Sequence, residues 1–132
     1  MNKEKLFTYC IPIDDGAAPN PYGDICTLNI CKPVIRRVAN IGDWVVGTGS
    51  KNSPIGDCSG KVVYAMKITD KKTMADYDKW AKKNCPIKEV DWRNTDHQRR
   101  LGDSIYDFST GVAVLRKSVH GIGNMQTDLG GE

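Results

Sequence analysis

The chain has 132 residues and a formal net charge of +3, with 39% hydrophobic and 27% charged residues. This length and balance fit one folded domain and exclude an intrinsically disordered chain. No stretch approaches the roughly 20 apolar residues that span a bilayer, and the N-terminus has no apolar run long enough for a signal peptide. We therefore expect a cytoplasmic protein without a membrane partner. The mild positive charge permits a nucleic-acid partner but does not require one.

The N-terminal part of the chain pairs an apolar segment with a long loop. Residues 6–13 (LFTYCIPI) predict a first strand, which Pro12 restricts to the edge or the end of a sheet. Residues 14–24 are rich in Gly, Pro, Asn and Asp and predict a loop. A loop of this length is often functional. Residues 26–31 predict a short strand or a turn.

The next segments predict a short helix and two strands. Residues 34–40 place their apolar side chains on one side, as a helix that begins near Pro33 would. A Gly-Asp turn then leads into a strand over residues 44–47, and residues 51–60 predict a loop. Residues 61–69 (KVVYAMKIT) alternate strongly and are partly apolar on both faces, which favours a strand in the centre of a sheet.

A longer helix is predicted after residue 73. Thr73 is suited to cap its N-terminus, with the carboxylate of Asp76 three residues later. The expected apolar stripe of this helix consists of Met74, Tyr77, Trp80 and Ala81. The following residues, 84–102, are polar and predict irregular structure.

The C-terminal part predicts a hairpin and then no closing element. Residues 105–108 and 112–115 flank Ser-Thr-Gly, a typical hairpin pattern. Residues 124–132 (NMQTDLGGE) run out in glycines. Either this segment is a frayed tail or the chain is cut before a last strand, and a tail is the commoner case.

The glycine-rich segment over residues 42–51 looks like a phosphate-binding loop, but its spacing excludes this. A P-loop needs G-x4-G-K-[ST] so that the lysine reaches the phosphates. Here Gly47 is followed by Thr48, and Lys51 is out of register. The dinucleotide fingerprint G-x-G-x-x-G fails as well, because Asn52 occupies its last position.

Cysteine spacing argues against a metal site. The five cysteines include no Cys-x-x-Cys pair; they are Cys10, Cys26, Cys31, Cys58 and Cys85. Structural zinc sites usually have tighter ligand spacing. Reduced, partly buried thiols are the better interpretation. We expect no metal and no cofactor.

Three residues are candidates for acid–base catalysis, namely Asp15, Asp43 and His120. Both aspartates adjoin a glycine, and a role in a turn explains them better. His120 suits a pocket, but nothing local pairs it with a serine or cysteine nucleophile. Whether the protein is an enzyme is open at this point.

A run of short motifs resembles one protein family. The motifs over residues 18–50 are APNPY, CTL, CKP, IRR, GDW and GTGS, and the run is long enough to be fairly specific. The pattern Gly102-Asp103-x-Ile105-Tyr106 and the spacing His120…Asn124…Asp128 extend the resemblance over residues 7 to about 128. The chain is similar to the nucleotide modification associated domain 2 family, which is found in bacteria and phages and is linked by its genomic company to DNA base hypermodification.

The resemblance implies a fold. A Gly-Asp turn, an apolar strand, a polar cluster, a loop and a second strand follow one another as in PUA-like domains. The implied architecture is α+β, a small mixed or antiparallel β-barrel of PUA-like type with a few short helices packed around it. It would form a single domain over residues 1–132. The family pattern continues into a further strand, so this chain is either shortened or closes its barrel differently. The implied setting is a bacterial cell or a phage-infected host.

The resemblance also implies a function, a binding module for a modified nucleotide or a flipped DNA or RNA base in base modification. A flipped base needs hydrogen bonds to its edge and a flat surface for stacking. The expected ligand contacts are Asn20, Tyr22, Trp44, Thr48, Gly49, Ser50 and Lys51. DNA is a further expected partner, through phosphate contacts of Lys32, Arg36 and Arg37.

Two alternatives stand beside the binding module. One is an enzyme, a hydrolase or transferase acting on a modified nucleotide or DNA base. The other is a scaffold that binds a protein through the charged segment 86–103. The sequence does not decide between them, nor does it give the oligomeric state.

Overall fold

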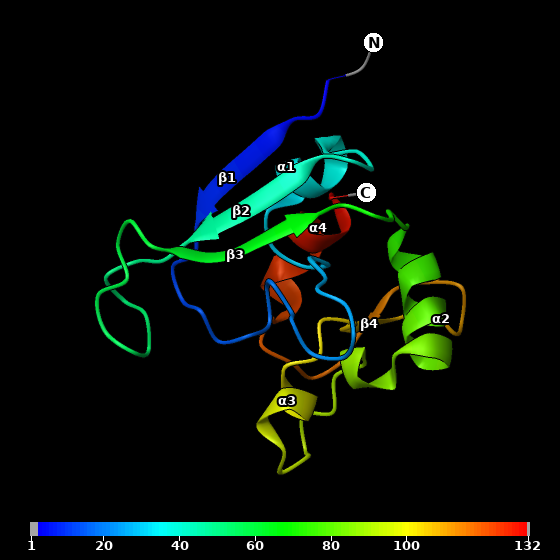
Figure 1. The fold of residues 1–132 in the computed structure, drawn as a ribbon. Helices are drawn as coiled ribbons and strands as arrows, with labels where there is room; N and C mark the ends of the chain where they lie inside the picture. The colour runs from blue at the N-terminus through cyan, green and yellow to red at the C-terminus, as the bar shows by residue number, and fades with distance from the viewer. Residues whose placement is uncertain (1–2, 132) are drawn as a thin grey trace. The chain divides into compact units, whose positions relative to one another are not determined.

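The computed structural model describes residues 3–131 and has an α+β fold of short helices and small sheets (Figure 1). Contacts group the chain into two compact units. The first, here called the sheet unit, comprises the residues up to Asp15 and Val38–Lys71. The second, the helical unit, comprises Gly16–Arg37 and the residues from Lys72 onward. Each unit is described by itself below.

The sheet unit is built on three strands, β1 (Leu6–Cys10), β2 (Trp44–Thr48) and β3 (Val62–Lys67). Their order is β1-β2-β3, with β1 parallel and β3 antiparallel to β2. β1 is therefore an edge strand, as Pro12 predicts. The prediction that the strand over 61–69 is central is wrong, because β2 holds that place. Apolar residues on both faces suggested burial, but Val62 is 65% exposed.

The β2 strand is flanked by a tyrosine from each neighbouring strand. Tyr9 and Tyr64 are both paired with Gly47, so all three lie on one face of the sheet. The two phenol oxygens are 2.7 Å apart, and the rings meet edge to face. Val45, one position further along this face, is 1% exposed. The glycine leaves room for aromatic rings over the middle of the sheet.

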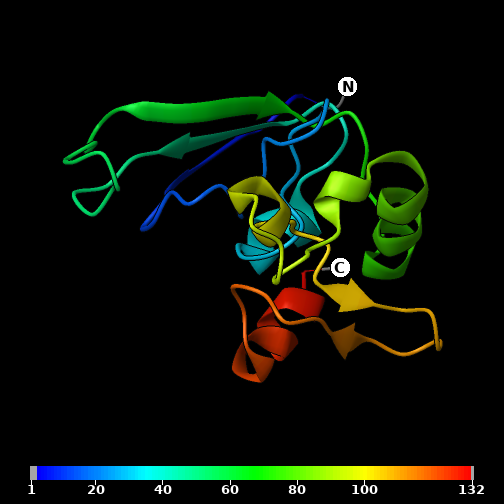
Figure 2. The same ribbon diagram turned by 90° about the horizontal axis from the view of Figure 1, so that it is seen from below.

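The helical unit contains most of the helices and a two-stranded sheet. Its elements are α1 (Pro33–Val38), α2 (Met74–Asn84), η1 (Pro86–Lys88), α3 (His97–Arg100), β4 (Tyr106–Asp107), β5 (Val114–Leu115), η2 (Ile122–Asn124) and α4 (Met125–Leu129). Figure 2 shows the hairpin of β4 and β5 beside α2.

Local sequence signals fix the beginnings of these elements. Pro33 is the first residue of α1, as its rigid φ favours. Thr73 caps α2 by accepting a hydrogen bond from the backbone N–H of Asp76. The predicted hairpin is confirmed, although each of its strands has only two residues.

The prediction of a frayed tail over residues 124–132 is wrong for the described part, which ends at residue 131. α4 follows η2 directly, and Asp128 on α4 is 1% exposed. Met125 and Leu129, four residues apart on α4, also pack against the core of the helical unit. A helix of five residues is too short for this spacing to stand out as a helical pattern in the sequence. Residue 132 lies outside the described residues.

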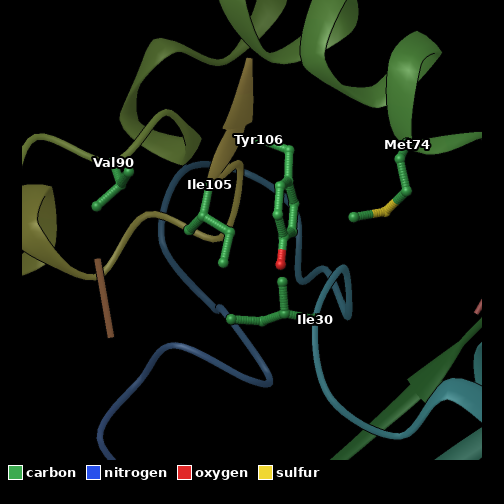
Figure 3. Close-up of a cluster of buried hydrophobic side chains, with 5 residues drawn as sticks. All are labelled: Ile30, Met74, Val90, Ile105 and Tyr106. Carbon is green, nitrogen blue, oxygen red and sulfur yellow. The ribbon is translucent and has the colours of Figure 1, made fainter. Parts of the chain in front are cut away.

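The core of the helical unit is small. It consists of Ile30, Met74, Val90, Ile105 and Tyr106 (Figure 3). Ile30 and Ile105 are fully buried. The hydroxyl of Tyr106 points toward Ile30. This places one polar group at the edge of an apolar core, where it needs a hydrogen-bond partner.

The strands of residues 3–131 form one three-stranded and one two-stranded sheet and no closed barrel. The α+β class is confirmed, whereas the PUA-like barrel is not. In the same part of the chain, no helix has both the length and the apolar character needed to cross a membrane.

Candidate functional site

The residue immediately before α1 and its neighbour have an unusual backbone. Cys31 has φ +60° and Lys32 has φ +43°, both in the left-handed region that non-glycine residues rarely occupy. Such a conformation costs about 1–3 kcal/mol per residue and persists only where the surroundings enforce it. Strained positions of this kind cluster at functional sites, so Cys31 is the first candidate.

Arg36 and Asp128 hold this turn in place. The Nε of Arg36 donates to the carbonyl oxygen of Cys31 at 2.6 Å, and its guanidinium also donates to the carbonyl oxygen of Asp128 at 2.8 Å. The backbone N–H of Cys31 donates to Oδ1 of Asp128 at 3.3 Å. Both backbone groups of Cys31 are thus tied to α1 and α4, and the turn cannot relax without breaking these bonds.

The side chain of Cys31 meets a histidine that lies far away in the sequence. Its Sγ is 3.4 Å from Nε2 of His120, across 89 residues of chain. The other ring nitrogen of His120, Nδ1, is 2.6 Å from Oδ2 of Asp128. Because an ionised carboxylate only accepts hydrogen bonds, Nδ1 must carry a proton and Nε2 faces the sulfur.

The Asp128 carboxylate is buried, and both of its oxygen atoms accept hydrogen bonds. Oδ2 accepts a second hydrogen bond from the hydroxyl of Tyr106 at 2.8 Å, and Oδ1 accepts from Cys31. The side chain of Asp128 is 1% exposed, whereas that of His120 is 16% exposed. Cys31 also keeps part of its surface. Cys31 and His120 are thus partly exposed, whereas Asp128 is buried.

Electrostatics favour an ion pair in this cluster. The hydrogen bond to Asp128, with a smaller contribution from Cys31, raises the pKa of His120 to about 10. Burial alone would raise the pKa of Asp128, but the hydrogen bonds from His120 and Tyr106 outweigh it and hold that pKa below its usual value. Burial and the Asp128 charge raise the pKa of Tyr106. At neutral pH the site therefore holds an imidazolium against an aspartate and a cysteine sulfur.

Cys31, His120 and Asp128 are arranged in space as a nucleophile, a histidine that transfers protons and a carboxylate that orients the histidine. A protonated histidine beside a cysteine sulfur is the arrangement that activates thiol nucleophiles. A buried carboxylate on the far ring nitrogen fixes the tautomer and the ring orientation. The cluster can therefore perform nucleophilic catalysis. We refer to these three residues as the Cys31 triad.

Sequence reasoning found one member of this triad and missed its connections. His120 was a candidate, but its partner Cys31 lies near the other end of the chain. The motif CKP at residues 31–33 and the spacing His120…Asn124…Asp128 were visible as part of the family resemblance. Asn124 supports the turn after His120, since its Oδ1 accepts from the backbone N–H of Gly121 at 3.0 Å. Periodicity alone gives no sign of the contact.

The two candidate aspartates, Asp43 and Asp15, both lie at turns or loops of the chain. Asp43 is 5% exposed, and its carboxylate accepts from the backbone N–H groups of Asn40 and Lys5. These bonds hold the pKa of Asp43 below its usual value and give it the role of a turn residue. Asp15 lies in the loop before Gly16, which has φ +92°. Both aspartates belong to the sheet unit, whereas the Cys31 triad belongs to the helical unit.

Asn20, at the tip of the long loop, is buried and extensively bonded. Its Nδ2 donates to the carbonyl oxygen of Leu101 at 2.9 Å, and its Oδ1 accepts from Nζ of Lys88 at 2.8 Å. The backbone N–H of Tyr22 donates to the same Oδ1 at 3.2 Å. These bonds account for Asn20 as a residue that orders the loop.

Lys88 is the centre of a buried polar network that the sequence did not reveal. The residue is fully buried, and its Nζ also donates to the carbonyl oxygens of Asn20 and Ile25 at 2.9 and 2.7 Å. Burial lowers the pKa of Lys88 and raises that of the nearby Asp103. Asp103 accepts from the hydroxyls of Thr27 and Tyr77. The network joins the long loop to the segment that was expected to be irregular and polar.

The remaining expected ligand contacts lie in the sheet unit, whereas Asn20 and Tyr22 lie in the helical unit. Ser50 donates from Oγ to the carbonyl oxygen of Pro12 at 2.8 Å, and Thr48 donates to that of Tyr9 at 3.3 Å. Trp44 is 39% exposed, and Lys51 is exposed. A Cβ on Gly49 would lie 2.6 Å from the carbonyl oxygen of Cys58. A pocket shared by these residues stays a prediction.

The three expected phosphate contacts lie around α1. Arg36 donates to backbone carbonyls near the Cys31 triad, and Arg37 donates to the carbonyl oxygen of Gly130 at 3.1 Å. Lys32 is partly exposed. The two arginines thus connect α1 to α4. Within residues 3–131, no group of three or more His, Cys, Asp or Glu side chains is arranged to hold a metal ion.

Comparison with known proteins places these residues in one family. A family model described as nucleotide modification associated domain 2 matches residues 3–128, nearly the whole chain and all members of the Cys31 triad. No curated protein and no solved structure matches the chain.

Proposed function

The chain belongs to the nucleotide modification associated domain 2 family, and from this premise we propose that it is an enzyme acting on a modified nucleotide or DNA base through a thiol nucleophile. One observation carries the proposal. Sγ of Cys31 lies 3.4 Å from Nε2 of His120, whose Nδ1 lies 2.6 Å from buried Asp128. The family supports a role in base modification, and the triad supplies a means of chemistry.

Each residue of the Cys31 triad has a separate task. The sulfur of Cys31 attacks an electrophilic carbon of the substrate. The Nε2–H of the His120 imidazolium faces the sulfur and gives its proton to the departing group. Asp128 stabilises the imidazolium and holds the ring in position without exchanging a proton itself. Tyr106 and Arg36 are positioning residues, because Tyr106 donates to Oδ2 of Asp128 and Arg36 donates to the carbonyl oxygens of Cys31 and Asp128.

The experiment is a product search with matched variants. The full chain is incubated with nucleotides and oligonucleotides that carry canonical or hypermodified bases, and products are identified by mass spectrometry. We expect turnover of a modified base that is lost in Cys31→Ser and reduced about 100-fold or more in His120→Gln. Cys58→Ser, at a partly exposed cysteine of the sheet unit, should retain full turnover. Undiminished turnover in Cys31→Ser would contradict the proposal.

A second candidate is a binding module that recognises a modified nucleotide or a flipped base without chemistry. Trp44 supports it, because 39% of its surface is exposed on β2 and offers a plane for base stacking. This binding module would contact its ligand through Tyr22, Ser50 and Lys51 as well. It would also imply that the sheet is related to PUA-like domains. It predicts that a nucleotide raises the melting temperature by mass action, that Trp44→Ala removes the shift, and that long incubation gives no product.

A further inference from the structure

We infer that the reaction at Cys31 is acyl transfer, in which a carbonyl group joined to nitrogen or oxygen on a modified base is moved onto Sγ as a thioester and then released to water. The substrate class is therefore an amide or an ester carried by the base. The inference rests on the proposed function, from which it takes the nucleophile, and adds the kind of bond that is cut.

The bonding of Asp128 limits how many protons the site can move. Its Oδ1 accepts from Cys31, and its Oδ2 accepts from His120 and Tyr106. A buried carboxylate filled in this way does not take a proton from a substrate. The proton on Nε2 of His120 is then the one that this cluster can transfer, and it lies beside the sulfur that forms the new bond. This suits a reaction with one leaving group.

Acyl transfer uses this proton in both of its halves. The thiolate of Cys31 adds to the carbonyl carbon, and His120 protonates the nitrogen or oxygen as its bond to that carbon breaks. The amine or alcohol leaves, and the acyl group remains as a thioester. Water then attacks the thioester carbon and gives a proton to Nε2 of His120. The carboxylic acid departs and the thiolate–imidazolium pair is restored, with water as the second reactant.

Two other reactions of cysteine nucleophiles fit the geometry less well. Phosphoryl transfer relies on a guanidinium fork that grips the phosphate oxygens. The guanidinium that contacts the Cys31 turn, Arg36, donates instead to the carbonyl oxygens of Cys31 and Asp128. Addition of a thiolate to a pyrimidine ring carbon releases no group beside the sulfur. In that reaction no leaving group would accept the proton from Nε2 of His120.

The backbone at Cys31 supports a nucleophile that must be presented on a rigid turn. Its φ of +60° and that of Lys32 at +43° form a strained turn immediately before α1. Acyl-transfer enzymes also place a nucleophile on a sharp, strained turn that opens a helix, so that its side chain is exposed. The bonds from Arg36 and Asp128 fix this turn from both sides. The strain and the triad are independent observations on one residue.

The test uses an activated ester, p-nitrophenyl acetate, with the full chain and no nucleotide. We expect a burst of p-nitrophenolate close to one per protein, an acetyl adduct in the intact mass, its location on Cys31 by peptide mapping, and its removal by hydroxylamine. Cys31→Ser should show no burst. His120→Gln should acetylate about 100-fold or more slowly, and Cys58→Ser should match the unmodified protein. The melting temperature of each variant establishes that it is folded.

The outcomes separate this inference from the function on which it rests. An adduct on Cys31 that depends on His120, with no product from any nucleotide, supports acyl transfer. The same result would contradict the proposal that the substrate is a modified nucleotide or base. Turnover of a modified nucleotide that requires Cys31, without an acyl adduct, overturns acyl transfer and leaves the proposed function intact. Acetylation spread over other cysteines, or equal rates in His120→Gln, overturns the inference.

Discussion

The Nδ1 atom of His120 lies 2.6 Å from Oδ2 of Asp128, so the charge of the imidazole is linked to the folded state. The pKa of His120 rises from 6.5 to about 10 on folding. The folded protein therefore binds more protons between these values than the unfolded chain, and stability falls as pH rises. The contribution of His120 is complete below pH 6.5 and absent above pH 10.

Urea unfolding at a series of pH values measures this effect. Between neutral pH and pH 10, the free energy of unfolding should fall by up to about 1.4 kcal/mol per pH unit. His120→Gln should flatten this part of the profile. His97→Gln, at an exposed histidine on α3, should leave it unchanged. Parallel profiles for the native chain and His120→Gln would mean that the ion pair with Asp128 does not exist in solution.

A second prediction concerns the reactivity of the thiols. The Cys31 sulfur faces the imidazolium of His120 at 3.4 Å, and a neighbouring cation of this kind is typical of reactive cysteines. Iodoacetamide at pH 6.5 should therefore alkylate Cys31 about tenfold or more faster than Cys58. Peptide mass mapping over time gives both rates in one sample. His120→Gln should remove the difference, and a preference for Cys31 that survives this substitution would assign it to exposure alone.

A third prediction tests the buried lysine. Nζ of Lys88 donates to three oxygen atoms of Asn20 and Ile25 at 2.7 to 2.9 Å. Lys88→Met keeps most of the side-chain volume but leaves these acceptors without their donor inside the protein. We expect a loss of about 2–4 kcal/mol in the free energy of unfolding, measured in urea. Lys83→Met, at an exposed position on α2, should change it by less than about 0.5 kcal/mol.

The outcome for Lys88 also bears on how much the sequence could predict. Signals that act over a few residues were sufficient for the cap of α2 at Thr73, for Pro33 at the start of α1 and for the hairpin. These elements follow from local hydrogen bonds and backbone preferences. Lys88 lies in a polar segment and gives no local sign of burial, because its partner Asn20 is 68 residues away.

The candidate site was hidden for the same reason. A histidine becomes a catalytic base only through its neighbours, and Cys31 lies 89 residues from His120. The edge position of β3 could not be predicted either, because alternation shows which residues share a face of a strand but not where the strand lies in the sheet. The sequence therefore predicted elements better than it predicted contacts between them.

A fourth prediction assigns Gly47 to packing. A Cβ added at this position would lie 2.4 Å from the ring of Tyr64 and 2.8 Å from Cδ1 of Ile11. Gly47→Ala should therefore destabilise the protein by about 1–3 kcal/mol, because the ring has to move. Gly123→Ala is the matched control, since nothing lies within 4 Å of its added Cβ. If both variants unfold at the same urea concentration, the sheet tolerates the methyl group and the packing role is wrong.

A final prediction concerns the bond between the hairpin and α2. Arg116, next to β5, donates to the carbonyl oxygens of Ser104 and Tyr106 at 3.1 Å and to Oδ1 of Asp78 at 3.0 Å. Asp78 lies on α2 with its side chain 3% exposed. Burial favours a raised pKa for Asp78, but the hydrogen bonds from Phe108 and Arg116 outweigh it and keep its pKa below the usual value.

Arg116→Lys keeps the charge but cannot reproduce the planar fork that reaches all three acceptors. We expect a loss of about 1–3 kcal/mol in the free energy of unfolding at neutral pH. The lowered pKa of Asp78 means that its charge contributes fully to stability above the usual pKa, and that this contribution is lost as the pH falls through the lowered value. The loss in Arg116→Lys should therefore shrink as the pH falls below about 4. Arg93→Lys, at an exposed position, should have no effect. A loss independent of pH would show that Arg116 acts through the two carbonyls and not through Asp78.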